Sequence, residues 1–263
     1  MSPRFASERS SDGHSAPRLA VVLIALLALS FPPAVAAQRS VTLLGGSMTK
    51  RPITSLEGID VSMWQGSINW SRVATTGKKF AFIRASAGSL TVDTTYTANR
   101  AGAKAAGLVI GAYHYGNPDN AVNDALNEAN WFLSLATPAT GELRPALDIE
   151  VANGLSPAAL QTWVASWLAR VTSVTGIKPI IYSTPSFWKD HLADSSWFAQ
   201  NGYTVLWIAH WQVKSPSVPA ANWAGYGWTF WQYSDCGTVS GIVGCVDLDR
   251  YNGSALASSL FMP

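Results

Sequence analysis

Two carboxylates, Asp148 and Glu150, lie one residue apart in the apolar segment "RPALDIEV" at residues 144–151. Residues i and i+2 of a β-strand point to the same face, so we expect both side chains to project together, with Cα atoms about 6.6 Å apart. Two acids held this close cannot both stay ionised, because the charge of each raises the pKa of the other. A protonated acid beside an ionised one is the pair that cleavage of a glycosidic bond requires.

Two further acids occupy comparable positions in the sequence. Asp60 ends the run "LEGID", and Asp247 lies near the end of an apolar stretch in "GCVDLDRY". The Asp148 segment runs into "VANGLSP", where Ser156 is expected to cap a helix and Pro157 to begin it. This order predicts acids at the C-terminal ends of barrel strands, where such folds assemble their chemistry.

The four acids also admit less specific interpretations. An isolated Asp-x-Glu is most often a surface or capping pair, and four carboxylates can bind a hard cation such as calcium or magnesium. The acids come from distant strand ends and not from one dense ligand loop. We therefore expect no metal at this site.

The elements that must position these acids alternate along the chain from Leu56 onward. Apolar strand-like runs such as "FAFIRAS", "LVIGAYHYG" and "KPIIYST" are separated by amphipathic helical stretches such as "SPAALQTWVASWLARVTSVTG". This alternation predicts an α/β fold whose roughly eight strands close into a barrel. Little helix separates "LWIAHW", "WTFWQY" and "VDLDRY", so the last third is expected to consist mainly of strands.

The composition fits one compact domain with a large core. Of 263 residues, 48% are hydrophobic and 13% charged, and the formal net charge is +2. Such a small net charge does not indicate nucleic acid or an anionic membrane as a partner. We expect a monomer.

Residues 1–37 have the pattern of an export signal. Three arginines precede the apolar run "LAVVLIALLALSF", and the small residues of "PPAVAA" predict cleavage near Ala36 or Ala37. The run is shorter than the roughly 20 residues that a membrane helix needs. We therefore expect a secreted protein without stable membrane association, in which residues 38–55 form an N-terminal tail and residues 56–263 the catalytic domain.

The remaining signals are cysteines and aromatic residues. The two cysteines, Cys236 and Cys245, are expected to form a disulfide, because an exported protein with two cysteines most simply pairs them. Aromatic faces can stack on sugar rings, although a core position is the default for any one tryptophan. The tryptophans that cluster late in the chain are Trp207, Trp211, Trp223, Trp228 and Trp231.

With these residues in place, the chain resembles the glycoside hydrolase family 25 lysozymes, which are secreted N-acetylmuramidases, from Leu56 to Gly253. The resemblance rests on the order and spacing of "GIDVSMWQGSINW", "GKKFAFIRASAG", "ALDIE", "IYSTPSFW", "LWIAHW", "FWQY" and "GIVGCVDLDRYNG". It implies a modified TIM-like (β/α)5(β)3 barrel. The implied reaction is hydrolysis of the β-1,4 bond between N-acetylmuramic acid and N-acetylglucosamine in peptidoglycan, with no cofactor.

The resemblance also implies roles for individual residues. Glu150 becomes the general acid, Asp148 its partner, and Asp60 and Asp247 the flanking carboxylates. An Asp-x-Glu pair facing a 2-acetamido sugar suits substrate-assisted catalysis, with Asp148 orienting the acetamide and net retention at the anomeric carbon. The candidates for ligand contact at comparable strand ends are Tyr113, Tyr182, Trp211 and Gln232, whereas His114 and His210 are expected to be structural.

Because the chain departs from the family pattern at two positions, other functions remain as alternatives. Ala87 replaces a glutamate and Thr91 an aromatic residue or leucine, so a catalytically weakened peptidoglycan-binding protein is the main alternative. A structural barrel without a sugar ligand is another. A chitinase-like glycosidase would need aspartates where this chain has Leu143 and Ala146, which argues against it.

Overall fold

A computed structural model describes residues 55–262, so the predicted export signal and residues 38–54 of the predicted tail lie outside the described residues. The strands are β1 (Leu56–Val61), β2 (Phe80–Ala87), β3 (Thr91–Val92), β4 (Val109–Tyr115), β5 (Ala146–Asp148), β6 (Ile180–Ser183), β7 (Leu206–Ala209), β8 (Phe230–Gly237) and β9 (Val246–Tyr251). Eight of them form a closed barrel in the order β1-β2-β4-β5-β6-β7-β8-β9, because β9 pairs with β1, and β3 extends the sheet from β2. The predicted α/β barrel is confirmed.

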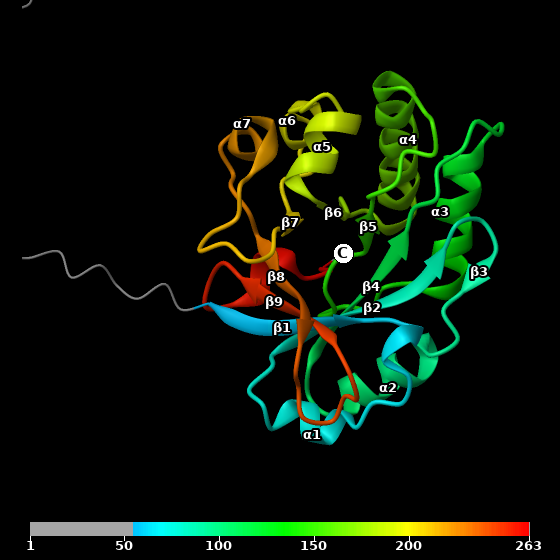
Figure 1. Ribbon diagram of the computed structural model, residues 1–263. Helices are drawn as coiled ribbons and strands as arrows, with labels where there is room; N and C mark the ends of the chain where they lie inside the picture. The colour runs from blue at the N-terminus through cyan, green and yellow to red at the C-terminus, as the bar shows by residue number, and fades with distance from the viewer. Residues whose placement is uncertain (1–54, 263) are drawn as a thin grey trace, which may run out of the picture. The chain divides into compact units, whose positions relative to one another are not determined.

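Helices surround most of this barrel. They are α1 (Trp70–Ala74), α2 (Tyr96–Ala105), α3 (Asp124–Leu135), α4 (Pro157–Thr175), α5 (Pro185–His191), α6 (Trp197–Gln200) and α7 (Pro219–Ala224), with 3-10 turns η1 (Met63–Gln65) and η2 (Leu256–Ser259). In Figure 1, α3 and α4 lie to the right of the strands and α5 to α7 above them, whereas β1, β8 and β9 lie at the left. Within residues 55–262, none of the helices has the length and apolar character needed to cross a membrane.

Strand direction decides which residues reach the rim formed by the C-terminal ends of the parallel strands. Around the barrel, neighbouring strands from β1 to β8 pair in parallel, but β9 runs antiparallel to both β8 and β1. Asp247 is the second residue of β9, so the prediction that it lies at the C-terminal end of its strand was wrong. Because the strand is reversed, its start meets the C-terminal ends of the other strands, and Asp247 pairs directly with Asp60.

The barrel interior below that rim is filled by aromatic side chains. Phe82 stacks on Trp207 with ring centroids 4.1 Å apart, and Phe230 meets Phe82 edge-on at 5.0 Å. A barrel of this size is a packed core and not a pore, so a cavity can form only at its end. Two of the late tryptophans, Trp223 and Trp231, belong instead to the core outside the barrel, as does His114.

The segment that carries the acid pair is fixed by the helix that follows it. Ser156 Oγ accepts a hydrogen bond from the backbone N–H of Ala159, and Pro157 occupies the first turn of α4, as predicted. This cap satisfies a donor that the helix leaves without an internal partner. It sets where α4 begins, at Pro157, seven residues after Glu150.

The predicted disulfide between Cys236 and Cys245 is present and closes the turn between β8 and β9. Gln65 Nε2 donates to the backbone oxygen of Cys245 at 3.3 Å, so this turn contacts η1. We expect Cys236→Ser with Cys245→Ser to lower the free energy of unfolding by about 2–3 kcal/mol, because the unfolded chain regains loop entropy. Urea unfolding of the double variant against wild type measures this, and equal midpoints would contradict it.

Candidate active site

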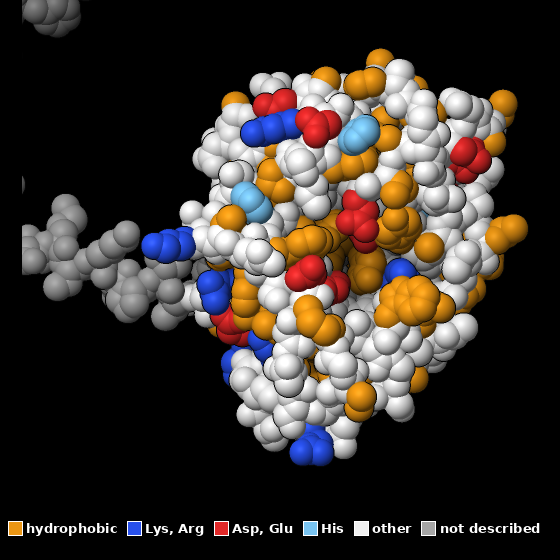
Figure 2. Space-filling model, viewed as in Figure 1, with side chains coloured by type: hydrophobic (Ala, Val, Ile, Leu, Met, Phe, Trp, Pro, Cys, Tyr) orange, Lys and Arg blue, Asp and Glu red, His pale blue; other side chains and the backbone are white. Residues whose placement is uncertain are grey.

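A pocket of about 370 Å³ opens at the end of the barrel that carries the C-terminal ends of β1 and β5 and the start of β9, and all four predicted acids line it. Figure 2 shows acidic side chains gathered around a hollow on this face, with hydrophobic side chains beside them. The full lining is Asp60, Ser62, Trp64, Gln65, Arg84, Tyr113, Tyr115, Asp148, Glu150, Tyr182, Trp207, Gln232 and Asp247.

Asp148 and Glu150 line the pocket together, as their spacing predicted. Asp148 is the last residue of β5 and is buried, whereas Glu150 follows the strand and is partly exposed. Burial raises the pKa of Asp148 well above its usual range, and the charges of Glu150 and Asp60 raise it further. Burial also raises the pKa of Glu150. The two groups titrate as a coupled pair that retains a proton at higher pH than free carboxyls do.

Asp60 is held by an amide. Gln232 Nε2 donates to Asp60 Oδ2 at 2.8 Å. The oxygen of the same amide, Oε1, accepts hydrogen bonds from Tyr182 Oη at 3.1 Å and from Trp211 Nε1 at 3.0 Å. The indole N–H of Trp211 can only donate, so the atom that it meets must be the amide oxygen and the amide nitrogen must face Asp60.

The four predicted ligand contacts divide into two groups. Tyr113, Tyr182 and Gln232 line the pocket and are buried. Trp211 is 38% exposed and is not part of the pocket lining, but it reaches the pocket through its bond to Gln232. Three of the four candidates therefore form one network around Asp60.

Sequence reasoning missed several lining residues. Trp64, which is 76% exposed, and Gln65 come from η1, and the motif "GIDVSMWQG" was the available signal for both. Arg84 comes from β2, and its charge opposes the rise in the pKa of Asp148. Arg84 Nε donates to Asp93 Oδ2 at 3.0 Å, and the same oxygen accepts the backbone N–H of Met63 at 2.8 Å. Asp93 therefore ties Arg84 to η1.

A fifth acid, Asp249, was also missed. It is fully buried below the pocket and accepts Trp207 Nε1 at 2.8 Å. Asp247 and Asp249 are two residues apart on β9, so the same spacing rule that paired Asp148 with Glu150 would have found it. Burial and the charge of Asp60 raise the pKa of Asp247 to about 9, and burial raises that of Asp249 to about 8.

His114 and His210 make contacts within the protein, as expected of structural residues. His114 is buried between Ser86 Oγ, 2.8 Å from its Nδ1, and Glu128 Oε2, 2.8 Å from its Nε2. Burial lowers the pKa of His114, which favours the neutral ring with its proton on Nε2, facing Glu128. His210 Nδ1 accepts the backbone N–H of Ser217.

The two departures from the family pattern, Ala87 and Thr91, pair with each other and do not line the pocket.

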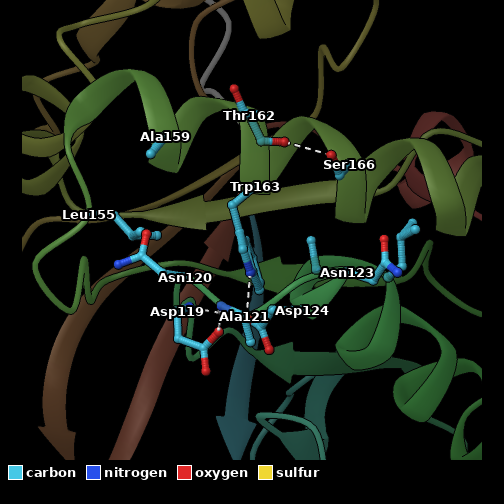
Figure 3. Close-up of a pocket in the computed structure, with 12 residues that line it drawn as sticks. Asp119, Asn120, Ala121, Asn123, Asp124, Leu155, Ala159, Thr162, Trp163 and Ser166 are labelled. Carbon is cyan, nitrogen blue, oxygen red and sulfur yellow. Dashed lines mark hydrogen bonds between the residues drawn. The ribbon is translucent and has the colours of Figure 1, made fainter.

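A second pocket, of about 390 Å³, lies between residues 119–126 and α4. Figure 3 shows Trp163 at its centre, with Nε1 donating to Asp124 Oδ2 at 2.7 Å. It contains none of the four predicted acids, so the chemistry belongs to the first pocket.

Among the residues that the structure describes, no group of three or more His, Cys, Asp or Glu side chains is arranged to hold a metal ion.

Comparison with known proteins identifies one family model and several relatives. Residues 59–242 match the family model described as glycosyl hydrolases family 25. Lysozyme M1 of Streptomyces globisporus is 38% identical over 212 residues, which are 77% of this chain and 69% of that protein. The N,O-diacetylmuramidase of Chalaropsis sp is 27% identical over 199 residues, which are 71% of this chain and 92% of that protein.

A solved structure of a lysozyme is also similar to this chain. The bacterial lysozyme from Streptomyces coelicolor superposes with a TM-score of 0.71 at 36% sequence identity, covering 78% of this chain and 95% of that chain. The matched segment 59–242 includes Asp60, Asp148 and Glu150, whereas Asp247 lies just beyond its end.

Proposed function

The chain belongs to glycosyl hydrolase family 25 and is a glycosidase, and we propose that it hydrolyses the β-1,4 bond between N-acetylmuramic acid and N-acetylglucosamine in peptidoglycan. The observation that carries this proposal is the pocket in which Asp148 and Glu150 meet two further acids. Solubilisation of purified peptidoglycan by the mature protein tests it. The rival, a binding protein that has lost catalysis, would sediment with the wall without solubilising it.

Glu150 is the general acid in this proposal. It is the more exposed member of the pair, so a glycosidic oxygen can reach it. Burial raises its pKa, so it keeps its proton at higher pH than a free glutamate does. After the first bond breaks, the same group takes a proton from the attacking water.

Asp148 is the orienting group. It is buried, and its Oδ1 has no hydrogen-bond partner within the described part of the chain. That oxygen is an acceptor suited to the N–H of a 2-acetamido group. With the amide held there, its carbonyl oxygen attacks the anomeric carbon from within the substrate, which is the exception to the two-carboxylate scheme.

This mechanism predicts net retention at the anomeric carbon. Two successive inversions, first by the acetamide oxygen and then by water, restore the original configuration. Proton NMR of the first product from a soluble wall glycan measures it. Initial release of the inverted anomer would contradict the role of Asp148 as the orienting group.

Asp60 and Asp247 are the flanking carboxylates in this proposal. They pair across β1 and β9, and burial raises the pKa of both. Near neutral pH the cluster therefore carries less negative charge than four free acids would. This lowers the repulsion that would otherwise oppose ionisation of Asp148.

The pH dependence of the rate follows from the coupled pair. Glu150 must be protonated to act, so the rate falls as pH rises through its raised pKa. Asp148 must be ionised to orient the amide, so the rate also falls as pH drops through its raised pKa. We expect a bell-shaped kcat/KM profile whose acid limb lies above the ordinary aspartate value of about 3.9. An acid limb at or below that value, in protein shown to be folded at that pH, would contradict the assignment.

We also propose that residues 1–37 direct export, with cleavage near Ala36 or Ala37, and that residues 56–263 form the catalytic domain of a secreted monomer. Peptidoglycan glycan strands are its proposed partner, with no nucleic acid and no stable membrane association after the signal is removed. No cofactor takes part. N-terminal sequencing of protein recovered from the culture medium tests the cleavage site.

A further inference from the structure

Asp249 is an acid that the proposed chemistry does not use. It lies on β9 opposite Gly58 of β1 and Gln232 of β8, and its side chain has no exposure to solvent. It is absent from the pocket lining, so no substrate atom can reach it directly. A fully buried carboxyl group is rare unless other groups satisfy both of its oxygens.

Only one of the two oxygens of Asp249 has a conventional donor. Oδ1 accepts Trp207 Nε1 at 2.8 Å, whereas no N–H or O–H of the described residues outside the carboxyl cluster donates to Oδ2. Asp249 lies opposite Gly58, which is two residues before Asp60 on the same face of β1, so the carboxyl of Asp60 is its neighbour across the strand pair. Burial and the charge of Asp247 raise the pKa of Asp249, and the charge of Lys78 lowers it. Two ionised carboxylates cannot hydrogen-bond to each other, because neither has a donor.

A shared proton resolves this arrangement. With one proton between Asp249 and Asp60, one carboxyl group donates to the other, and the orphaned oxygen acquires a partner. Burial and the charge of Asp249 both raise the pKa of Asp60, in agreement with a retained proton. Asp60 is then held on one side by Gln232 Nε2 and on the other by Asp249.

We propose that Asp249 is a positioning residue for the glycosidase reaction: its carboxyl group shares a proton with Asp60 and holds Asp60 in the orientation that faces the substrate. A continuous chain of hydrogen bonds then runs from Trp207 in the barrel core through Asp249 and Asp60 to Gln232 at the rim. This inference rests on the proposed function, because it assigns Asp60 to the catalytic pocket.

Kinetics on a soluble wall glycan test the positioning role with two variants of nearly equal size. In Asp249→Asn the amide oxygen can still accept from Trp207 and the amide nitrogen can donate to Asp60, so kcat should stay within about threefold of wild type. In Asp249→Leu neither bond remains, so kcat should fall about tenfold or more while KM changes little. The control is Asp190→Asn, which removes an exposed acid at the end of α5. Equal kcat in wild type and Asp249→Leu would overturn the proposal.

Thermal unfolding without substrate tests the shared proton independently of activity. The folded state holds protons that the unfolded chain releases above about pH 4, so wild-type stability should fall as pH rises through the pKa of Asp249, about 8. Asp249→Asn replaces a titrating group by one that does not titrate. Its midpoint temperature should therefore decline less between about pH 6 and pH 9 than that of wild type or Asp190→Asn.

The two tests separate the possible failures. An Asp249→Asn variant whose midpoint declines as steeply as that of wild type would overturn the shared proton, even if Asp249→Leu does not fold. If wild type binds peptidoglycan without hydrolysing it, the proposed function fails and with it the positioning role of Asp249 in the reaction. The shallower pH slope would then still establish the shared proton.

Discussion

Glu150→Gln is expected to reduce kcat about 10²–10⁴-fold, the range that a positioned general acid contributes. The amide has nearly the same size as the carboxyl group but has no acidic proton to give to the leaving oxygen. Glu150 lies after β5 and is partly exposed, so the substitution leaves no buried group without a partner. KM should therefore change little. Initial rates on a soluble wall glycan measure both parameters.

The control for Glu150→Gln is an activated substrate. A leaving group that departs without protonation does not need the general acid, so an aryl glycoside of the same sugar should recover most of the lost rate. The acid-to-amide change should also remove the alkaline limb of the pH profile. A variant that keeps wild-type rates on the wall glycan would exclude Glu150 as the acid.

Asp148→Asn is expected to have an effect of comparable size with a different signature. An amide can hydrogen-bond the 2-acetamido group, but it cannot stabilise the positive charge that develops as the acetamide oxygen attacks. We expect kcat to fall about 10²–10³-fold, the cost of losing one preorganised electrostatic partner. The activated aryl substrate should not restore the rate, because the acetamide oxygen must still attack the anomeric carbon whatever the leaving group is.

The pKa of the neighbouring acid gives a second signature for Asp148→Asn. The charge of Asp148 no longer acts on the pair once the amide is present, so Glu150 should lose its proton at lower pH than in wild type. The alkaline limb of kcat/KM should therefore move to lower pH. An unchanged limb would show that the two carboxyls are not coupled, and rescue by the aryl substrate would make Asp148 a second proton donor.

The acid pair was predictable because the signal is local. The period of two along a strand places Asp148 and Glu150 on one face in any fold that makes residues 146–150 extended. The Ser156 cap and the Pro157 start of α4 were predictable for the same reason, since they depend on neighbouring residues only. Sheet closure followed from the number and alternation of the strands.

The direction of β9 was not inferred, although the sequence carried a hint. A parallel connection needs a dozen or more residues and usually a helix, but only residues 238–245 separate β8 from β9. A short connection of this kind requires antiparallel strands. Applying that rule would have placed Asp247 at the start of its strand.

Other parts of the site depend on contacts between distant segments. Arg84 reaches the pocket because Asp93 holds it against η1, a contact that joins three segments. Trp211 was expected at the ligand but contacts Gln232 from outside the pocket, because its position depends on how the chain turns after β7. No local pattern records such contacts, so only the folded structure reveals them.

The most direct test is to digest purified peptidoglycan with residues 38–263 and with their Glu150→Gln variant, reduce the products and identify the new terminal sugar by mass spectrometry. Muropeptides that end in reduced N-acetylmuramic acid, abundant with wild type and nearly absent with the variant, are the predicted result. Products that end in N-acetylglucosamine, or equal release by both proteins, would contradict a muramidase that uses Glu150.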